Sequence, residues 1–349
     1  KTLEFEDKVR KYLKSKYVFS VNSCTSGIHA ALIALNAKKN DEVLTPANTF
    51  ISTINTLYNL GLKIKFCDVN KNTGAIDLEI FKKNITKKTK FFIPVHFAGN
   101  PINIKEITRY ALKKKIKVID DAATAFGSEI QGKKIGSFKN TVTVFSLHAN
   151  KSLAIGEGGL ISTQNKLIAK KLSLIINCGL VKTSWKRNTK IKFQTLNTIL
   201  PGYKFNFNDI LSSIAIAQLK NYNRVLKFRH KLKKKYISNL KKLLENKVIS
   251  LPKELPHTKS SMYCFQIKIS KKKLRNKLAQ KLEKSSISTT VYYTPANFHK
   301  FYKKIFRKSK LPNTKEIFEN SLSLPFHNAL KIKDINFICR KLIIFFNKF

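Results

Sequence analysis

The chain has 349 residues, of which 43% are hydrophobic and 11% aromatic, a composition that predicts a folded globular protein and excludes intrinsic disorder. Its length favours one large and one small domain. No stretch of about 18 consecutive apolar residues occurs, so no transmembrane helix and no membrane partner is predicted.

The formal charge of +48 at pH 7 permits two interpretations. A nucleic-acid or anionic-membrane surface would account for it, as would a lysine-rich composition spread over every exposed face. Lysines occur throughout, as in residues 113–115 and 233–235, without an RNP box, a zinc finger or a dense basic arm. We favour the second interpretation and do not expect nucleic acid as a partner, although the charge should attract phosphate-bearing ligands.

The cysteine pattern argues against both a disulfide framework and a zinc site. The five cysteines are odd in number, widely spaced and free of any CxxC motif. They are typical of reduced thiols in the cytoplasm, so we predict a cytoplasmic protein without a metal centre.

The N-terminal region opens with an amphipathic pattern over residues 1–17, which predicts a helix, followed by a short strand at 18–21. A hydroxyl-rich turn at 22–27 then precedes a second helical pattern. Backbone N–H groups at such a helix start form an anion site, but Ser and Thr there also serve as ordinary N-caps. The segment alone leaves the two readings equally open.

Short apolar strands then alternate with helical patterns of 10 to 15 residues. This alternation predicts an α/β three-layer sandwich with a mostly parallel sheet, whose ligands bind at the carboxyl ends of the strands. The strands are expected at residues 42–45, 63–69, 91–95, 117–119 and 142–147.

The second half predicts a different organisation. Residues 181–203 have weak periodicity and are interpreted as a functional or intersubunit loop. A long helix from residue 209 to about 245 should link two domains, and the patterns after it predict a smaller α+β unit. We therefore place a large domain at 1–225 and a smaller C-terminal α+β domain at 226–349.

Four unrelated features follow predicted strands at one edge of the sheet: the anion turn, Phe50, Asp121 and Lys151. The lysine precedes a glycine turn and could form a Schiff base with an aldehyde cofactor. The aspartate could keep a pyridine nitrogen protonated, the turn could hold a phosphate, and the aromatic ring could stack on the cofactor. This set describes pyridoxal 5′-phosphate.

The chain resembles the DegT/DnrJ/EryC1/StrS sugar aminotransferases, which have the aspartate-aminotransferase fold type I. The resemblance runs from about residue 4 to the C-terminus. It rests on six motifs in order: SCTSGIHAAL (23–32), DEVLTPANTFIST (41–53), FIPVHFAGNP (92–101), VIDDAATAFGS (118–128), FSLHANKSLAIGEGG (145–159) and PGYKFNFNDILSSIAIAQL (201–219).

The resemblance assigns roles to individual residues. Lys151 matches the family's Schiff-base lysine and proton carrier, and Asp121 matches the partner of the pyridine nitrogen. Thr25 and Ser26 match the turn that holds the cofactor phosphate, to which Ser146 is expected to add its hydroxyl.

Other matches are less direct. Phe50 matches the aromatic residue over the cofactor ring, and Lys204 and Asn206 lie in the segment that reaches the neighbouring subunit's cofactor phosphate in the family. Which of these two does so stays open. Thr124 stands where many relatives have Gln or His beside the cofactor's O3′, and Cys178 replaces a frequent His-Gly, which leaves the contacts at both positions open.

Five histidines lie near these motifs: His29, His96, His148, His299 and His327. Packing or hydrogen bonding is favoured over acid–base roles for four of them. For His148, three residues before Lys151, contact with the cofactor and no contact are equally open.

The resemblance implies a homodimer that transfers an amino group, with glutamate as the expected donor, to a keto group of a nucleotide-linked deoxysugar for polysaccharide or glycan biosynthesis. Two alternatives on the same fold are a sugar dehydratase, which Lys151 argues against because that branch carries His there, and a non-catalytic regulator. A basic nucleic-acid-binding protein would explain the charge but not the ordered motifs.

Overall fold

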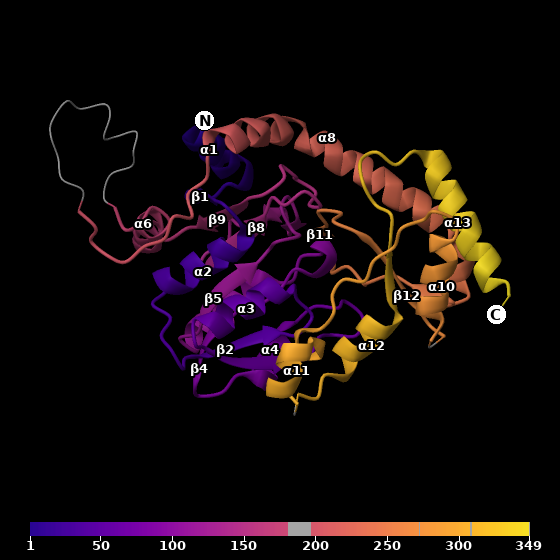
Figure 1. Ribbon diagram of the computed structural model, residues 1–349, viewed down its shortest axis with the longest axis horizontal. Helices are drawn as coiled ribbons and strands as arrows, with labels where there is room; N and C mark the ends of the chain where they lie inside the picture. Colours follow the sequence, from indigo (N-terminus) through magenta and orange to yellow (C-terminus); the bar gives the residue numbers. More distant parts are fainter. Residues whose placement is uncertain (181–196, 272, 308, 349) are drawn as a thin grey trace.

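The computed structural model describes residues 1–180, 197–271, 273–307 and 309–348. Most of the loop predicted at 181–203 therefore lies outside the described residues. A large domain built on a seven-stranded sheet and a smaller C-terminal unit are joined by one long helix (Figure 1).

The large sheet has the strand order β1-β9-β8-β5-β4-β2-β3. Five neighbouring strands run parallel, whereas β9 is antiparallel to both β8 and β1. The prediction of a mostly parallel sheet is confirmed. In chain order the strands are β1 (Tyr17–Val21), β2 (Glu42–Pro46), β3 (Lys63–Cys67), β4 (Thr89–Phe92), β5 (Lys117–Asp121), β8 (Thr141–Ser146) and β9 (Gly159–Thr163).

Helices cover both faces of this sheet, so its central strands are apolar on both sides. Every residue of β8 is buried. Its side chains alternate, with Val142 and Val144 in the core under one set of helices and Phe145 in the core under the other. The first set is α2 (Cys24–Ala34), α3 (Ile51–Asn59) and α6 (Lys166–Ile175), and the second is α1 (Thr2–Leu13), α4 (Leu78–Asn84) and α5 (Ile104–Lys113) with the start of α8.

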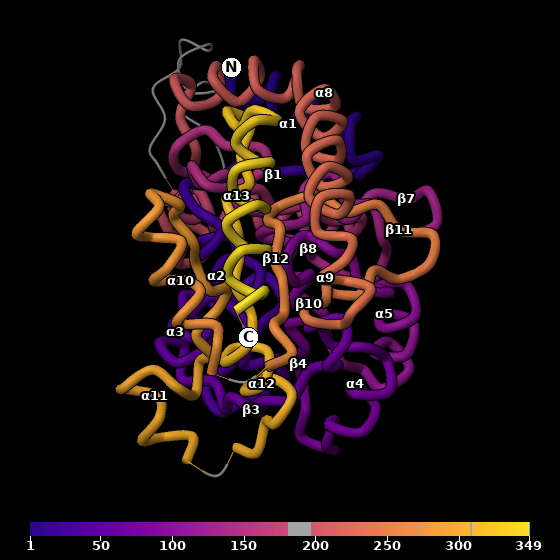
Figure 2. The backbone as a smooth tube through the Cα atoms, turned by 90° about the vertical axis from the view of Figure 1, so that its right-hand side faces the viewer, coloured from indigo at the N-terminus to yellow at the C-terminus, as the bar shows by residue number. Residues whose placement is uncertain are grey.

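The smaller unit has its own core around an antiparallel sheet of order β10-β12-β13. Helix α13 packs along the end of α8, as the rotated view in Figure 2 shows. The elements are β10 (Ile249–Ser250), β12 (Phe265–Ile269), β13 (Ser321–Leu324), α9 (Lys241–Glu245), α10 (Leu274–Glu283), α12 (Pro312–Asn320) and α13 (Ile332–Phe346).

Helix α8 (Asp209–Asn239) runs without interruption through the division expected at residues 225 and 226. Its first half contributes Tyr222 to the large-domain core and its second half Leu232 to the smaller core. A division near residue 225, within this helix, stays our proposal.

Two C-terminal segments return to the large domain. The short helices η2 (Ala296–Phe298) and α11 (Lys300–Ile305) place Ala296 and Tyr302 in a core that consists mainly of large-domain residues. A small sheet, β11-β6-β7, also pairs β11 (Thr258–Lys259) with β6 (Glu129–Ile130), and β7 (Lys133–Lys134) completes it. The two units are therefore interleaved near the site described below.

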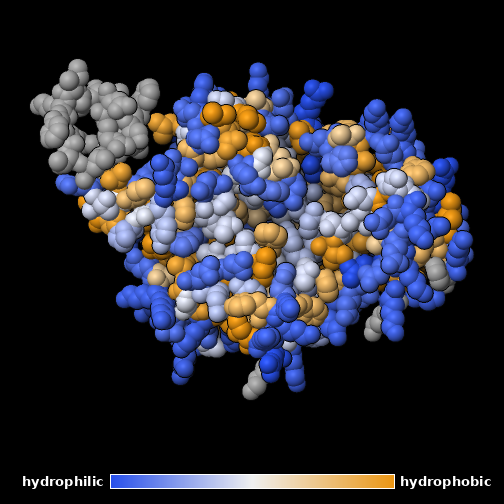
Figure 3. Space-filling view, viewed as in Figure 1, coloured by the Kyte–Doolittle hydropathy of each residue, from blue (hydrophilic) through white to orange (hydrophobic). Residues whose placement is uncertain are grey.

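The visible surface is mostly hydrophilic, with scattered apolar side chains, including some over the start of α8 (Figure 3). Among the helices of the described residues, none combines the length and apolar character that a bilayer crossing requires.

Helix α6 tests the assignment of the core. Leu172 is 0% exposed and packs under the sheet, whereas Leu167 on the same helix is 70% exposed. We expect Leu172→Ala to lower the free energy of unfolding by about 2–5 kcal/mol, because it leaves a cavity. Leu167→Ala should change it by less than about 0.5 kcal/mol. Equal losses in chemical denaturation of the two variants would contradict this packing.

Candidate active site

A cavity of about 520 Å³ lies at the carboxyl ends of the large-sheet strands. Five of the residues predicted from the sequence line it: Thr25, Phe50, Asp121, Ser146 and Lys151. They come from the starts of two helices, the ends of two strands and the turn after β8. The sheet therefore brings together side chains that are far apart in the chain; Thr25 and Lys151 are separated by 126 positions.

The hydroxyl-rich turn is both an N-cap and part of the cavity wall. Ser23 caps α2, its Oγ accepting the Ser26 N–H at 3.1 Å and lying 2.9 Å from the Ser26 hydroxyl. The predicted Ser26 is thus bonded within the turn and is not among the lining residues, whereas Thr25 is. A helix start carries the positive end of the helix dipole, so the turn suits an anion.

The glycine turn after Lys151 packs directly against this helix start. A Cβ atom on Gly159 would lie 2.6 Å from the backbone nitrogen of Cys24, a distance that real Cβ atoms do not tolerate. Glycine is therefore required where β9 begins, and the close approach joins the lysine-bearing turn to the anion turn.

Asp121 ends β5 and is only 4% exposed. Its carboxylate accepts the Thr53 hydroxyl at 2.9 Å and the Ala123 backbone N–H at 3.1 Å. Burial raises the pKa of this carboxyl, and the two hydrogen bonds and nearby Lys151 oppose that rise. Asp121 thus presents a largely desolvated carboxyl to a cationic partner in the cavity.

Lys151 is partly buried in the turn that follows β8. Its Nζ lies 3.5 Å from the Tyr263 hydroxyl and 4.5 Å from the centre of the same ring. Burial lowers the pKa of the Lys151 amine, whereas the negative charge of Asp121 raises it. A lowered pKa leaves more of the amine unprotonated, which nucleophilic attack on a carbonyl requires.

Thr124 does not face the cavity. Its hydroxyl donates to the backbone carbonyl of His96 at 2.8 Å, and the side chain is buried behind the site. His96 is also buried, with its Nε2 2.8 Å from Asp120 Oδ1 and its Nδ1 accepting the Ile102 N–H. A cofactor contact by Thr124 stays an untested prediction, and in this arrangement its hydroxyl is bonded elsewhere.

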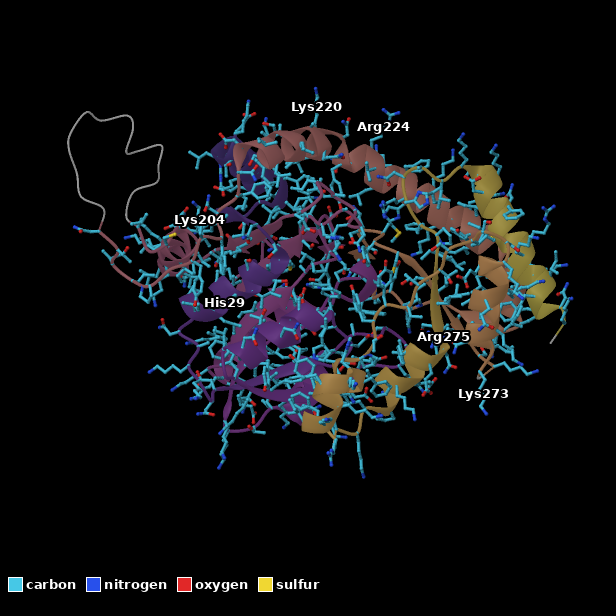
Figure 4. All side chains as sticks on the ribbon, viewed as in Figure 1. His29, Lys204, Lys220, Arg224, Lys273 and Arg275 are labelled. Atoms are coloured by element: carbon cyan, nitrogen blue, oxygen red, sulfur yellow. The ribbon has the colours of Figure 1, made fainter. Side chains whose placement is uncertain are left out.

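Lys204 and Asn206 also lie outside the cavity of their own chain. They are exposed on an extended segment in which Lys204 pairs with Asn177 and Asn206 with Val21. Figure 4 shows where Lys204 lies. This placement leaves both side chains available to another subunit.

One wall of the cavity, the tyrosine wall, has no recognisable pattern in the sequence. Tyr263, Tyr292 and Tyr293 line it from the C-terminal part of the chain. The Tyr293 ring lies 6.1 Å from that of Phe50, which is 58% exposed at the same cavity. The only local signal is the aromatic pair in the stretch VYYTP, and nothing in its periodicity points to a site.

Two of the five histidines line the cavity. His148 does so with its Nε2 3.5 Å from Glu157 Oε1, and His299 does so beside η2. His29 instead packs edge-on against the rings of Tyr203 and Phe205, which stack on each other. Among the described residues, no group of three or more His, Cys, Asp or Glu side chains is arranged to hold a metal ion.

A family model described as the DegT/DnrJ/EryC1/StrS aminotransferase family matches residues 1–343. The chain belongs to this family. The resemblance seen in the motifs is thereby confirmed.

Other members extend the comparison. The uncharacterized protein MJ1066 of Methanocaldococcus jannaschii is 38% identical over 338 residues, which cover 96% of this chain and 87% of that protein. The structure of Helicobacter pylori PseC, an aminotransferase involved in the biosynthesis of pseudoaminic acid, has 25% identity, a TM-score of 0.90, and coverage of 100% of this chain and 91% of that one.

A Streptococcus pneumoniae protein, Spr1654, named as a sugar aminotransferase, matches with a TM-score of 0.90 in its PMP form and 0.89 in its PLP form, each at 24% identity. The two matches cover 99% of this chain and 92% and 91% of those chains. These likenesses confirm the predicted fold, a type I aminotransferase fold.

The cavity of this family member fits pyridoxal phosphate, and the predicted cofactor is confirmed at the level of the family. Its donor set matches the group: hydroxyls of Thr25 and Ser146 beside a helix start for a phosphate, the Asp121 carboxyl for a protonated ring nitrogen, and the Lys151 amine for the aldehyde carbon.

The buried Asp121 should make the stability of the cofactor-free enzyme depend on pH. Its folded-state pKa is raised, so ionisation disfavours the folded state as the pH rises from about 4 through that raised pKa. We expect the unfolding free energy of Asp121→Asn, relative to wild type, to increase over this interval and then level off. Denaturant titrations across pH measure this difference. A difference that does not change with pH would contradict the burial effect.

Proposed function

We propose that the protein is a pyridoxal-phosphate-dependent sugar aminotransferase that moves an amino group from glutamate to a keto group of a nucleotide-linked deoxysugar. The observation that carries the proposal is the single cavity in which Lys151, Asp121, Thr25 and Ser146 meet. Family membership supports the reaction class. The product would serve polysaccharide or glycan biosynthesis.

Each residue has a chemical task in this proposal. Pyridoxal phosphate supplies an electron sink that stabilises negative charge beside the amino group. The Asp121 carboxylate pairs with the ring nitrogen, and the anion turn with Ser146 fixes the phosphate. Lys151 Nζ, with its pKa lowered by burial, takes up and returns the transferred proton. Phe50, whose ring centre lies 6.1 Å from that of Tyr293, would stack on the cofactor ring.

The substrate class is proposed on two grounds. The relatives named above include a protein named as a sugar aminotransferase and an enzyme of pseudoaminic acid biosynthesis. The formal charge of +48 attracts polyanions, and a nucleotide-linked sugar carries negative phosphates. Glutamate as donor is carried over from the family resemblance.

We also propose a cytoplasmic homodimer with shared active sites. The exposed Lys204 and Asn206 lie on a segment that carries further exposed apolar side chains, Ile199, Tyr203 and Ile210. Apolar side chains beside exposed polar groups are typical of a protein interface. The five cysteines are all unpaired in the structure, in keeping with a reducing compartment.

A spectroscopic titration tests the reaction. Wild-type protein with pyridoxal phosphate should show a long-wavelength cofactor band that glutamate converts to the shorter-wavelength band of pyridoxamine phosphate. Lys151→Ala should lose the long-wavelength band, because the amine that bonds to the cofactor aldehyde is absent. Turnover should fall by at least about 10³-fold, because the same amine carries the transferred proton. A band that glutamate leaves unchanged would favour the dehydratase or regulator alternative, and full turnover by Lys151→Ala would overturn the proposal.

The shared site predicts an effect of Lys204 on cofactor binding. If Lys204, and not Asn206, reaches the partner subunit's cofactor, Lys204→Ala should weaken binding of pyridoxal phosphate to the dimer by about 3- to 30-fold, because an interaction with phosphate is lost. Lys220→Ala, which removes the same charge from the exposed face of α8, should leave it unchanged; Figure 4 shows the two lysines on different parts of the molecule. Equal effects would indicate a general charge effect, and a monomer in sedimentation at micromolar concentration would contradict the dimer.

A further inference from the structure

Tyr263 is the side chain from the C-terminal part of the chain that contacts Lys151. Its hydroxyl lies 3.5 Å from Lys151 Nζ, with Nζ as the donor, and Nζ stands 4.5 Å from the centre of its ring. The tyrosine is buried, and burial raises the pKa of its phenol. The raised pKa favours the neutral phenol, whose oxygen and ring face both stabilise the ammonium form of Lys151. Cys24, Asp121 and Cys264 also face this amine and raise its pKa.

The segment that carries this tyrosine, residues 260–263, is bonded to the large domain. The Ser261 hydroxyl donates to the Thr124 carbonyl at 2.5 Å, and the Ser261 N–H donates to the Ser128 hydroxyl at 2.9 Å. The Ser260 hydroxyl donates to the Gly99 carbonyl at 3.1 Å. A Cβ atom on Gly99 would lie 2.3 Å from Ser261 Oγ, so the two segments are in close contact.

Arg229 of α8 holds the same segment from its other side. Its Nη1 donates to the carbonyls of Met262 at 2.9 Å and Tyr263 at 3.3 Å, and its Nε donates to Asn328 Oδ1 at 2.9 Å. The residue is only 4% exposed, and burial lowers the pKa of its guanidinium. Burying a guanidinium is costly unless its donors are bonded. Here they are bonded mainly to the backbone that carries Tyr263.

We infer that Tyr263 is a positioning residue for Lys151 and that Arg229 fixes Tyr263 in place. The inference rests on the proposed function, because it concerns the amine that acts there. In this arrangement α8 and the 260–263 segment set the direction in which Lys151 Nζ points. The direction of the catalytic lysine thus depends on how the C-terminal unit docks on the sheet.

The test follows the protonation of Lys151 in the cofactor-free protein. Trace acetylation with acetic anhydride at a series of pH values, quantified on the peptide that contains Lys151, gives the titration midpoint of its amine. Tyr263→Phe keeps the ring and removes the hydroxyl. We expect it to lower this midpoint by about 0.5 to 1 pH unit, because a hydrogen bond to the charged form is lost.

Tyr292→Phe is the matched control. Tyr292 lines the same cavity, and its side chain is hydrogen-bonded to that of Tyr263, but the structure shows no bond from it to Lys151. In Tyr292→Phe the Lys151 midpoint should shift less than in Tyr263→Phe, because the Tyr292 hydroxyl acts on Lys151 only through Tyr263. An unchanged midpoint in Tyr263→Phe, or an equal shift in Tyr292→Phe, would overturn the role of the Tyr263 hydroxyl.

Arg229→Lys tests the second half of the inference, because lysine keeps the charge but cannot bond both carbonyls in the same way. It should shift the Lys151 midpoint in the same direction, and the double variant with Tyr263→Phe should shift it no further than Tyr263→Phe alone. Additive shifts would show that Arg229 acts independently and would overturn its role.

These readouts are separable from the proposed function. If wild-type protein forms no cofactor band, the proposed function fails whatever the titrations show. If the band forms and responds to glutamate, but Tyr263→Phe leaves the titration midpoint of Lys151 unchanged, only the inference about Tyr263 fails. Thermal melting of each variant establishes that it is folded before it is titrated.

Discussion

The site depends on the burial of two ionisable groups in one cavity, Lys151 and Asp121. Burial disfavours the charge on each, so the lysine is pushed toward its free amine and the aspartate toward its protonated form, while each attracts the charge of the other. In the proposed function, a cofactor with a cationic ring and an electrophilic carbon would interact favourably with both groups. Burying these two groups lowers the stability of the cofactor-free protein, and binding of the cofactor would offset that loss.

The rest of the large domain positions these two groups. Asp121 ends a central strand and is bonded to Thr53 of α3, and Lys151 follows the neighbouring strand. Gly159 allows the lysine turn to contact the helix start at Ser23. The parallel strands bring all of these groups to one edge because their carboxyl ends coincide there. No single segment would hold the geometry alone.

The C-terminal unit completes the cavity from the other side. It supplies Tyr263, Tyr292 and Tyr293 to the cavity. Its helix α11 also packs into a core made mainly of large-domain residues. The buried Arg229 and the bonds of Ser261 tie this unit to the sheet. The two units therefore close around the site, with α8 common to both, and the high positive charge remains on the outer surface, where most lysines are exposed.

The residues alone determined the α/β fold, the order of the central strands along the chain, and four features of the cavity, namely the turn with Thr25, Phe50, Asp121 and Lys151. These follow local patterns: apolar strands, N-cap chemistry and glycine turns at strand ends. Ser146 is expected only from the family resemblance. Tertiary structure decided the rest. Tyr263 reaches Lys151 across 112 positions through packing that has no periodic signature. Likewise, Thr124 follows Asp121 closely, yet its hydroxyl turns to the His96 carbonyl, because a buried donor must find an acceptor wherever the fold provides one.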